Sequence, residues 1–292
     1  MKKTNIFVVA AAASMIAGVA AAQTLGATPT GTQTADDVRN LERQIEDDAR
    51  RTRVGNAGRT VGTYGSVALR ATSLDRNGGT DVTTVGVGVN YGFYDGVNGS
   101  EFNLSYVYSD SSDPASTDNV NTVTASYDYT RDFSPRLFGY AAIDIKSDQE
   151  ADTAVAGDIS KDAFIGFGIG YRVIDTPQVS WAIKAGPGYR AFERTPTPPT
   201  VPGTFEKIDE VAYSAESNFS YSFSDTVYVS NDTTIIGSDA LSTVKNDLAL
   251  NVAMSNALSL RTSYISEFNG ADLGSLDNSE NTFGVSVVYN FN

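Results

Sequence analysis

From about Gly62 to Asn292, apolar and polar residues alternate with a period of two, the pattern of β-strands whose two faces meet different surroundings. The last segment shows it clearly, with apolar positions at Phe283, Val285, Val287, Tyr289 and Phe291 and polar or small residues between them, apart from Val288. The same alternation recurs along the chain and is weaker near residues 65–72, 137–146 and 226–236. Together these segments predict twelve strands.

The predicted strands are joined alternately by long and short links. The long links are residues 73–81, 109–120, 147–162, 191–210, 237–244 and 269–281, and the short ones include 95–100, 131–134, 175–178, 224–225 and 255–257. Long outer loops and short periplasmic turns are typical of a transmembrane β-barrel with both termini in the periplasm, whereas a soluble β-sandwich has no reason to keep this order. Only closure removes sheet edges in lipid. We therefore predict an all-β fold, a closed antiparallel transmembrane β-barrel over residues 62–292.

Aromatic residues mark the ends of the predicted strands. A girdle at the periplasmic membrane interface is predicted from the aromatics nearest the short turns: Tyr91, Phe93, Tyr127, Tyr129, Tyr171, Trp181, Tyr221, Phe223, Tyr289 and Phe291. A second girdle towards the long links is predicted from Tyr108, Tyr189, Tyr213, Phe268 and Phe283.

The first 61 residues differ from the rest. Lys2 and Lys3 precede an apolar run that ends in Ala20-Ala21-Ala22, which predicts a signal peptide over residues 1–22 and an exported protein. Residues 23–61 form a periplasmic linker with a short helix predicted over 34–53, since Thr34 can cap it and its charges suit the helix dipole. Its narrow apolar stripe can pack in a homo-oligomer, lie on another surface or enter a pore.

Charge is segregated if the apolar faces point outward. The long links hold eighteen acidic and four basic residues, a net charge of −14 that equals the formal net charge of the whole chain. The lumen receives seven of each sign and is nearly neutral. These candidate pore or pairing residues are Arg70, Glu101, Asp128, Asp144, Lys146, Arg172, Lys184, Arg190, Glu216, Asp232, Lys245, Asp247, Arg261 and Glu267. Such a lumen is either filled by paired charges or a narrow channel lined by them.

Composition excludes most enzyme chemistry. The chain has no His and no Cys, so it has no thiol nucleophile, no Ser-His pair and no zinc finger. We expect no enzyme activity, no cofactor and no metal site, since no stretch matches a calcium-binding loop. The acidic balance also argues against nucleic acid as a partner.

Several stretches resemble the family of salt-induced outer-membrane proteins, whose domain has no settled function. They are SYDYTRDF (126–133), GFGIGYR (166–172), WAIKAGPGYR (181–190), NDLAL (246–250), LSLRTSY (258–264) and VVYNF (287–291). The resemblance spans about residues 62–292 and implies an outer-membrane barrel whose expression responds to salt, without catalytic residues. The chain ends in Asn292 rather than an aromatic, so Tyr289 and Phe291 would serve as the signal for the barrel assembly machinery.

We therefore expect a bacterial outer-membrane barrel with a structural or narrow-pore role in envelope integrity and salt response. Two alternatives stay open: a porin-like passive channel for small solutes or ions, and a surface-binding protein acting through its acidic loops. The expected partners are the lipid bilayer, lipopolysaccharide and the barrel assembly machinery, with a homo-oligomer through residues 34–53.

Overall fold

Twelve β-strands make up the computed structural model, which describes residues 61–74, 82–111, 120–151, 153–154, 157–196, 203–255, 257–270 and 278–291. The strands are β1 (Gly62–Leu74), β2 (Val82–Tyr94), β3 (Asn98–Ser111), β4 (Val120–Asp132), β5 (Leu137–Asp148), β6 (Ile159–Asp175), β7 (Val179–Arg194), β8 (Glu206–Ser222), β9 (Val227–Ser238), β10 (Ser242–Ala253), β11 (Leu258–Gly270) and β12 (Asn278–Phe291). The predicted signal peptide and the helix over residues 34–53 lie outside the described residues.

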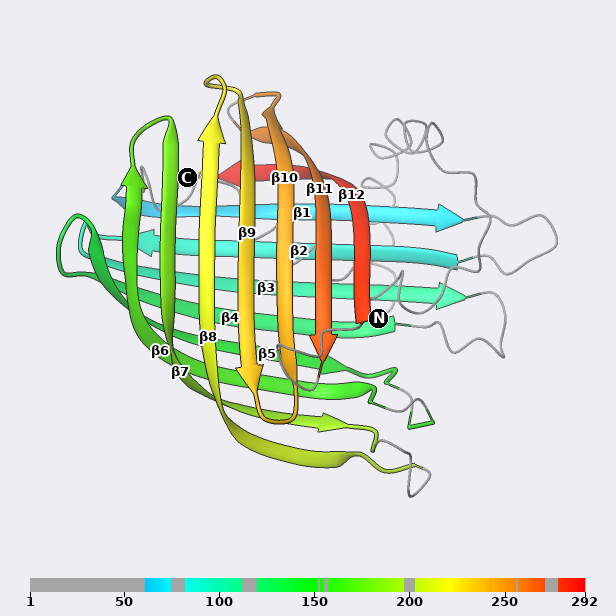
Figure 1. Ribbon diagram of the computed structural model, residues 1–292. Helices are drawn as coiled ribbons and strands as arrows, with labels where there is room; N and C mark the ends of the chain where they lie inside the picture. The colour runs from blue at the N-terminus through cyan, green and yellow to red at the C-terminus, as the bar shows by residue number, and fades with distance from the viewer. Residues whose placement is uncertain are drawn as a thin grey trace, which may run out of the picture.

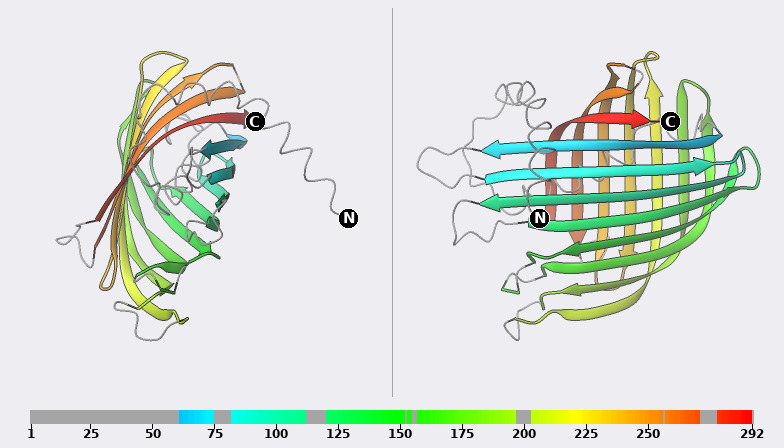
Figure 2. Two further views of the ribbon diagram at one scale, coloured as in Figure 1. Left: turned by 90° about the vertical axis from the view of Figure 1, so that its right-hand side faces the viewer. Right: turned by 180° about the vertical axis from the view of Figure 1, so that it is seen from behind.

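Each strand pairs antiparallel with the next one in sequence, and β1 pairs with β12 to close the sheet. The prediction of a closed antiparallel barrel of twelve strands is confirmed. Closure is brief at this seam, since the paired positions run only from Gly65–Phe291 to Leu69–Val287. Strands β1–β5 cross strands β8–β11 steeply in projection, β6 and β7 curve between the two walls, and β12 bends so that its end runs alongside β1 (Figures 1 and 2). None of the described residues forms a helix long and apolar enough to cross a membrane.

Alternate side chains point to opposite surfaces of the wall. In β6, Ile165, Phe167 and Ile169 are 55%, 64% and 65% exposed on the outer face, while the Phe164 side chain is buried inside. The inner face elsewhere carries small polar residues such as Ser126 and Ser263, which are also buried. This inversion of the usual burial pattern is expected where the outer face meets hydrocarbon.

The short turns share one stabilising device, a side-chain oxygen that accepts hydrogen bonds from backbone amides later in the turn. Asp95 accepts from the amides of Val97 and Asn98, at 2.8 and 2.6 Å. These amides, with that of Asn98 contributing most, hold the pKa of Asp95 below its ordinary value. The same role is taken in the other short turns by Ser134, Thr176, Ser224 and Ser255. The turns are therefore closed by residues local to each hairpin.

One predicted long link is wrong. Strands β9 and β10 are joined by residues 239–241 only, not by a loop over 237–244. The Ser238 hydroxyl donates a 2.7 Å hydrogen bond to the Leu241 carbonyl oxygen, and the Ala240 amide donates to Glu210 of β8. This hairpin is tight because inward side chains of the longer neighbouring strands form hydrogen bonds with its backbone. The β7–β8 link is likewise shorter than predicted, 195–205 rather than 191–210, because both strands continue into it.

A glycine-lined corner bends the barrel between β6 and β7. A Cβ added at Gly186 would overlap the carbonyl oxygen of Phe167, and one at Gly168 would overlap that of Ala185. The backbones approach so closely that only glycine fits at these positions. The Phe164 ring covers two further inward glycines, Gly166 and Gly188. The corner therefore depends on glycines, which place no side chain in the wall, and on aromatic rings that fill the space beside them.

We expect Gly186→Val to prevent folding of the barrel or to lower its free energy of unfolding by more than about 3 kcal/mol, the upper range for overpacking, because the obstacle is backbone. The matched control is Ala185→Val, which adds the same side chain to the outward, exposed neighbour on β7. The folded fraction can be measured by heat-dependent electrophoretic mobility and by urea unfolding in lipid vesicles. Equal stability of both variants would contradict the role of the corner.

Candidate functional site

The lumen is the candidate site, and its best-defined part lies along the inner surface of the corner. Lys184 of β7 extends its ammonium group to Glu216 of β8, at 3.0 Å, and to Asp128 of β4, at 3.6 Å. It also lies 4.9 Å from the ring centroid of Tyr140 in β5, a cation–π contact. The Tyr140 hydroxyl is 3.0 Å from the Ser214 hydroxyl of β8. Apart from the pair with Glu216 on the adjacent β8, these contacts cross the interior and connect strands that are not neighbours in the sheet.

A second group of charges lies towards the long links. Arg190 donates two hydrogen bonds to Asp162 of β6, from Nε at 3.0 Å and from Nη2 at 2.6 Å. Arg194 pairs with Glu206 at 2.7 Å, and both arginines flank the Phe192 ring, with distances of 5.3 and 5.6 Å to its centroid. Their remaining donors reach backbone carbonyl oxygens of the β9–β10 turn. The end of the corner that lies towards the long links is therefore hydrogen-bonded to the shorter β9–β10 hairpin.

A third group lies towards the short turns. Arg172 pairs with Asp132 at 2.6 Å and donates a 3.1 Å hydrogen bond to the Pro135 carbonyl oxygen. Its guanidinium lies 4.9 Å from the centroid of the Phe138 ring. The Tyr94 hydroxyl donates to the same Asp132 at 2.8 Å.

The three groups form one column, which we call the corner column: Arg172, Lys184, Arg190 and Arg194 with their acidic partners and the rings of Phe138, Tyr140 and Phe192. Each cation is paired with a carboxylate, and the side chains of Arg172, Lys184 and Arg190 are at most 16% exposed. A buried charge needs a close partner of opposite sign, because only the attraction between the two offsets the free energy lost on removing the charge from water. The corner column therefore fills its part of the lumen with neutralised, tightly held side chains.

The other walls carry separate polar networks. On β10 and β11, Arg261 donates to Asp247, and both side chains are buried. Asn218 donates to Asp232 across β8 and β9 at 3.0 Å. On the opposite wall, Glu101 accepts hydrogen bonds from Tyr64 and Asn90, at 3.0 and 2.8 Å.

The remaining predicted lumen residues lie in the strands as follows. Asp144 and Lys146 are in β5, where Lys146 is directly opposite Asp162 of β6. Lys245 of β10 is opposite Glu267 of β11. The side chains of Arg70 and Glu267 lie outside the described part of the structure.

The sequence prediction missed several members of the corner column. The sequence places Asp162 and Glu206 in long links, but β6 begins before Asp162 and β8 begins at Glu206, so both face inward in strands. The alternation indicates this for Asp162, because Asp162, Phe164 and Gly166 are two residues apart and therefore point to the same face of the strand. The inward aromatics Phe138 and Tyr140 were also missed, although they alternate in step with Asp144. Among the described residues, no group of three or more acidic side chains is arranged to hold a metal ion.

The predicted periplasmic aromatics lie at the short-turn ends of the strands. Tyr91, Phe93, Tyr127, Tyr171, Phe223 and Tyr289 are exposed, Tyr129, Trp181 and Tyr221 are partly exposed, and the Phe291 side chain is outside the described part. Some of their hydroxyls meet turn residues: Tyr129 donates to Asn98 at 2.8 Å, and Tyr221 accepts from Gln178 at 3.1 Å. An apolar ring with a hydrogen-bonded polar tip suits a membrane interface.

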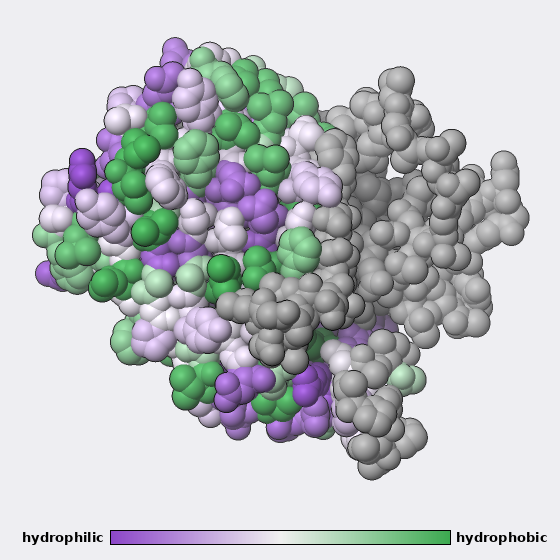
Figure 3. All heavy atoms as spheres, in the orientation of Figure 1, coloured by the Kyte–Doolittle hydropathy of each residue, from purple (hydrophilic) through white to green (hydrophobic). Residues whose placement is uncertain are grey.

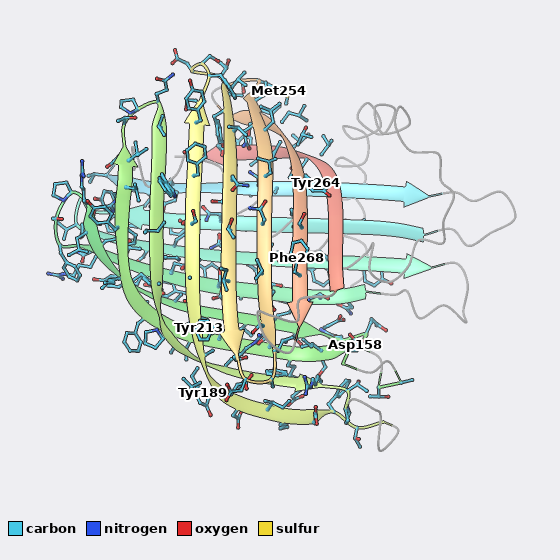
Figure 4. The ribbon with its side chains drawn as sticks, viewed as in Figure 1. Asp158, Tyr189, Tyr213, Met254, Tyr264 and Phe268 are labelled. Atoms are coloured by element: carbon cyan, nitrogen blue, oxygen red, sulfur yellow. The ribbon has the colours of Figure 1, made fainter. Side chains whose placement is uncertain are left out.

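Towards the long links, Tyr189, Tyr213 and Phe268 lie on the wall of β7, β8 and β11, with Tyr264 nearer mid-strand (Figure 4). Tyr189 and Tyr213 are exposed, and Phe268 is partly exposed.

Comparison with known proteins places the chain by family and by fold. A family model described as "Protein of unknown function, DUF481" matches residues 71–291. Comparison with curated proteins gives no match.

Three solved structures illustrate the similarity of fold. The COG4313 outer membrane channel from Pseudomonas putida F1 is 12% identical, with a TM-score of 0.50 over 82% of this chain and 99% of that one. The translocator domain of autotransporter NalP from Neisseria meningitidis is 13% identical, with a TM-score of 0.47 over 88% and 96%. A NanC porin is 10% identical, with a TM-score of 0.47 over 77% and 98%.

At 12% identity, the likeness to the COG4313 outer membrane channel shows the fold alone, that of outer-membrane β-barrel proteins. The family model, in contrast, matches the sequence from within β1 to the end of β12. The chain therefore belongs to the family of proteins of unknown function designated DUF481.

Proposed function

We propose that the protein is an outer-membrane barrel with a structural or narrow-pore role in envelope integrity, including integrity under changing salt. The observation that carries this proposal is the corner column, in which Lys184 of β7 joins Asp128 of β4 across the interior and also pairs with Glu216 of the adjacent β8. A wide diffusion pore needs water where these side chains lie. Rigid, neutralised side chains narrow the lumen and brace the wall from within.

Charge balance fits the same role. Each basic residue of the corner column has an acidic partner, and its four cations face five carboxylates, so the charges nearly cancel and the column has only a weak field to select a strongly anionic or cationic solute. A binding pore for anionic solutes would instead be expected to carry unpaired arginines or lysines. The geometry therefore favours a barrel that passes small ions at most.

One observation favours a passive channel as the second candidate. Away from the corner, the hydroxyls of Ser220, Ser230, Ser263 and Ser286 are buried, and none has a hydrogen-bond partner within the described part of the structure. Buried hydroxyls of this kind are usually satisfied by ordered water. A row of them across β8–β12 is compatible with a narrow hydrated path along that wall.

The two candidates differ in conductance. We expect the wild-type protein in a planar bilayer to show small openings at most, with weak ion selectivity. Lys184→Met leaves Asp128 and Glu216 without their cation, so cations should become favoured. One unit charge is worth about 1 kcal/mol even at high dielectric, so the cation-to-anion permeability ratio should rise about fivefold. The reversal potential in a salt gradient measures this ratio.

The matched control is Ile183→Met, which places the same new side chain on the outer face of β7, next to Lys184. It should leave the reversal potential unchanged. Large, stable openings of the wild-type protein would contradict the narrow lumen and support the channel candidate.

The proposed orientation places the short turns in the periplasm and the long links outside. The absence of native cysteine allows single-cysteine labelling without background. We expect a membrane-impermeant maleimide to label Glu150→Cys, between β5 and β6, in intact cells, and Asp225→Cys, between β8 and β9, only after the outer membrane is permeabilised. The reverse pattern would invert the topology.

The role in the envelope is tested in the host bacterium. Deletion of the gene should raise uptake of a hydrophobic fluorescent dye, with the larger increase after a shift in salt concentration. Re-expression of the wild-type chain should restore the barrier. Uptake that stays equal at every salt concentration would argue against the structural role, whatever the conductance of the barrel.

A further inference from the structure

One part of the lipid-facing surface is polar. In β1–β7, the described outward side chains between the first and last large apolar residue of each strand are apolar, as in β3 with Phe102, Leu104, Tyr106 and Tyr108, apart from Lys161 near the long-link end of β6. Strands β8–β11 differ, because outward positions there carry amides and hydroxyls. We call this group the outer polar patch: Ser217 in β8, Asn231 and Thr233 in β9, Asn246 in β10 and Ser266 in β11.

The strand register brings these residues together. Asn246 is directly opposite Thr233 on one side and Ser266 on the other, and Thr233 is opposite Ser217. Asn231 and Asn246 exchange amide hydrogen bonds of 3.2 and 3.3 Å, and Asn246 also donates to the Thr233 hydroxyl at 2.8 Å. Hydrogen bonds thus join three of the five side chains, while Ser217 accepts a 3.1 Å hydrogen bond from the Trp181 indole and Ser266 adjoins the patch by register.

The outer polar patch lies within the apolar belt rather than at its rim. Along β8, Ser217 stands between the outward aromatics Phe219 and Tyr213; along β10, Asn246 stands between Val244 and Leu248. Figure 3 shows hydrophilic surface in the middle of the face that β8–β10 form in this view. Amide groups exposed to hydrocarbon are unfavourable even when partly satisfied, and polar residues inside a membrane usually mark an interaction.

The central strand of the patch, β9, also presents a low surface. Strand β6 presents three large side chains that are each more than half exposed, whereas β9 presents no large hydrophobic side chain that is as much as 36% exposed. Small side chains allow two walls to approach closely, and polar groups between them then gain hydrogen bonds that lipid cannot supply.

We propose that the outer polar patch is the contact surface for a second copy of this chain, forming a dimer with its two-fold axis along the membrane normal. Such an axis places the patch against itself while keeping both copies in the same orientation. Amides and hydroxyls are both donors and acceptors, so the patch is complementary to its own copy. It carries no charged side chain, so nothing in it selects a charged partner. This contact is independent of whether the lumen conducts and of residues 34–53.

Cysteine crosslinking of the full chain in outer membranes tests the contact, with Asn231→Cys as the probe. The control is Leu104→Cys, outward on β3, six strands away in the barrel. Under mild oxidation, we expect Asn231→Cys to give a disulfide dimer of twice the chain mass, with at least tenfold more dimer than the control. Dimer yields that do not differ, or a crosslink to a chain of another mass, would overturn the proposal.

A second measurement separates specific contact from collision. The wild-type chain in mild detergent should run as a dimer by light scattering, and the double variant Asn231→Leu/Asn246→Leu should run as a folded monomer, with folding checked by heat-dependent mobility. A monomeric wild-type chain would overturn the proposal. So would a dimer that survives the double substitution but is lost when residues 23–53 are deleted, because that outcome assigns the contact to the N-terminal segment.

Discussion

Closure of the sheet is the constraint on which the rest of the structure depends. A spanning sheet in lipid must pair all its backbone groups, and twelve strands can do so only as a ring. The ring here is bent sharply between β6 and β7, where the glycines of the corner let two backbones meet. That bend brings β4 and β5 towards β7 and β8, and the facing side chains must then fill a narrow space. The ion pairs of the corner column follow from this geometry, since charged groups so close together must neutralise one another.

The contrast between the two halves of the lumen has a physical origin in side-chain size. At the corner, rings of Phe138, Phe164 and Phe192 occupy the inner face, and long basic side chains lie against two of them. Along β8–β12, smaller side chains lie on the inner face, among them the buried serines Ser220, Ser263 and Ser286. The outward pattern is asymmetric too, because the amides of the outer polar patch lie on the same strands. One side of the barrel is therefore braced from within by ion pairs and rings, while the other carries small polar side chains inside and the outer polar patch within its apolar outer face.

Much of the architecture could be predicted from alternation alone, because a strand in a membrane wall separates apolar from polar side chains at every step. The strand count and closure followed from that pattern. The β9–β10 link was wrong because its tightness depends on Glu210 and on Arg190 and Arg194 of other strands, which no local pattern reveals. The weak alternation near residues 226–236 had a physical cause as well, since Asn231 and Thr233 occupy outward positions. Which charges pair could not be predicted, because the corner decides that in three dimensions.

The shared design of the short turns has a consequence for how the barrel forms. Each of the five turns is closed by an oxygen from its own sequence, such as Asp95 or Ser224, so each hairpin can fix its register with contacts a few residues apart. Strands β1 and β12 belong to none of these five hairpins. They pair with each other over a few positions, although they lie at opposite ends of the strand order. Their pairing bears the whole entropic cost of joining the chain ends. The barrel can then assemble from five hairpins with fixed registers, which pair with their neighbours in sequence across the long links. The β1–β12 pair is the one that joins strands distant in sequence.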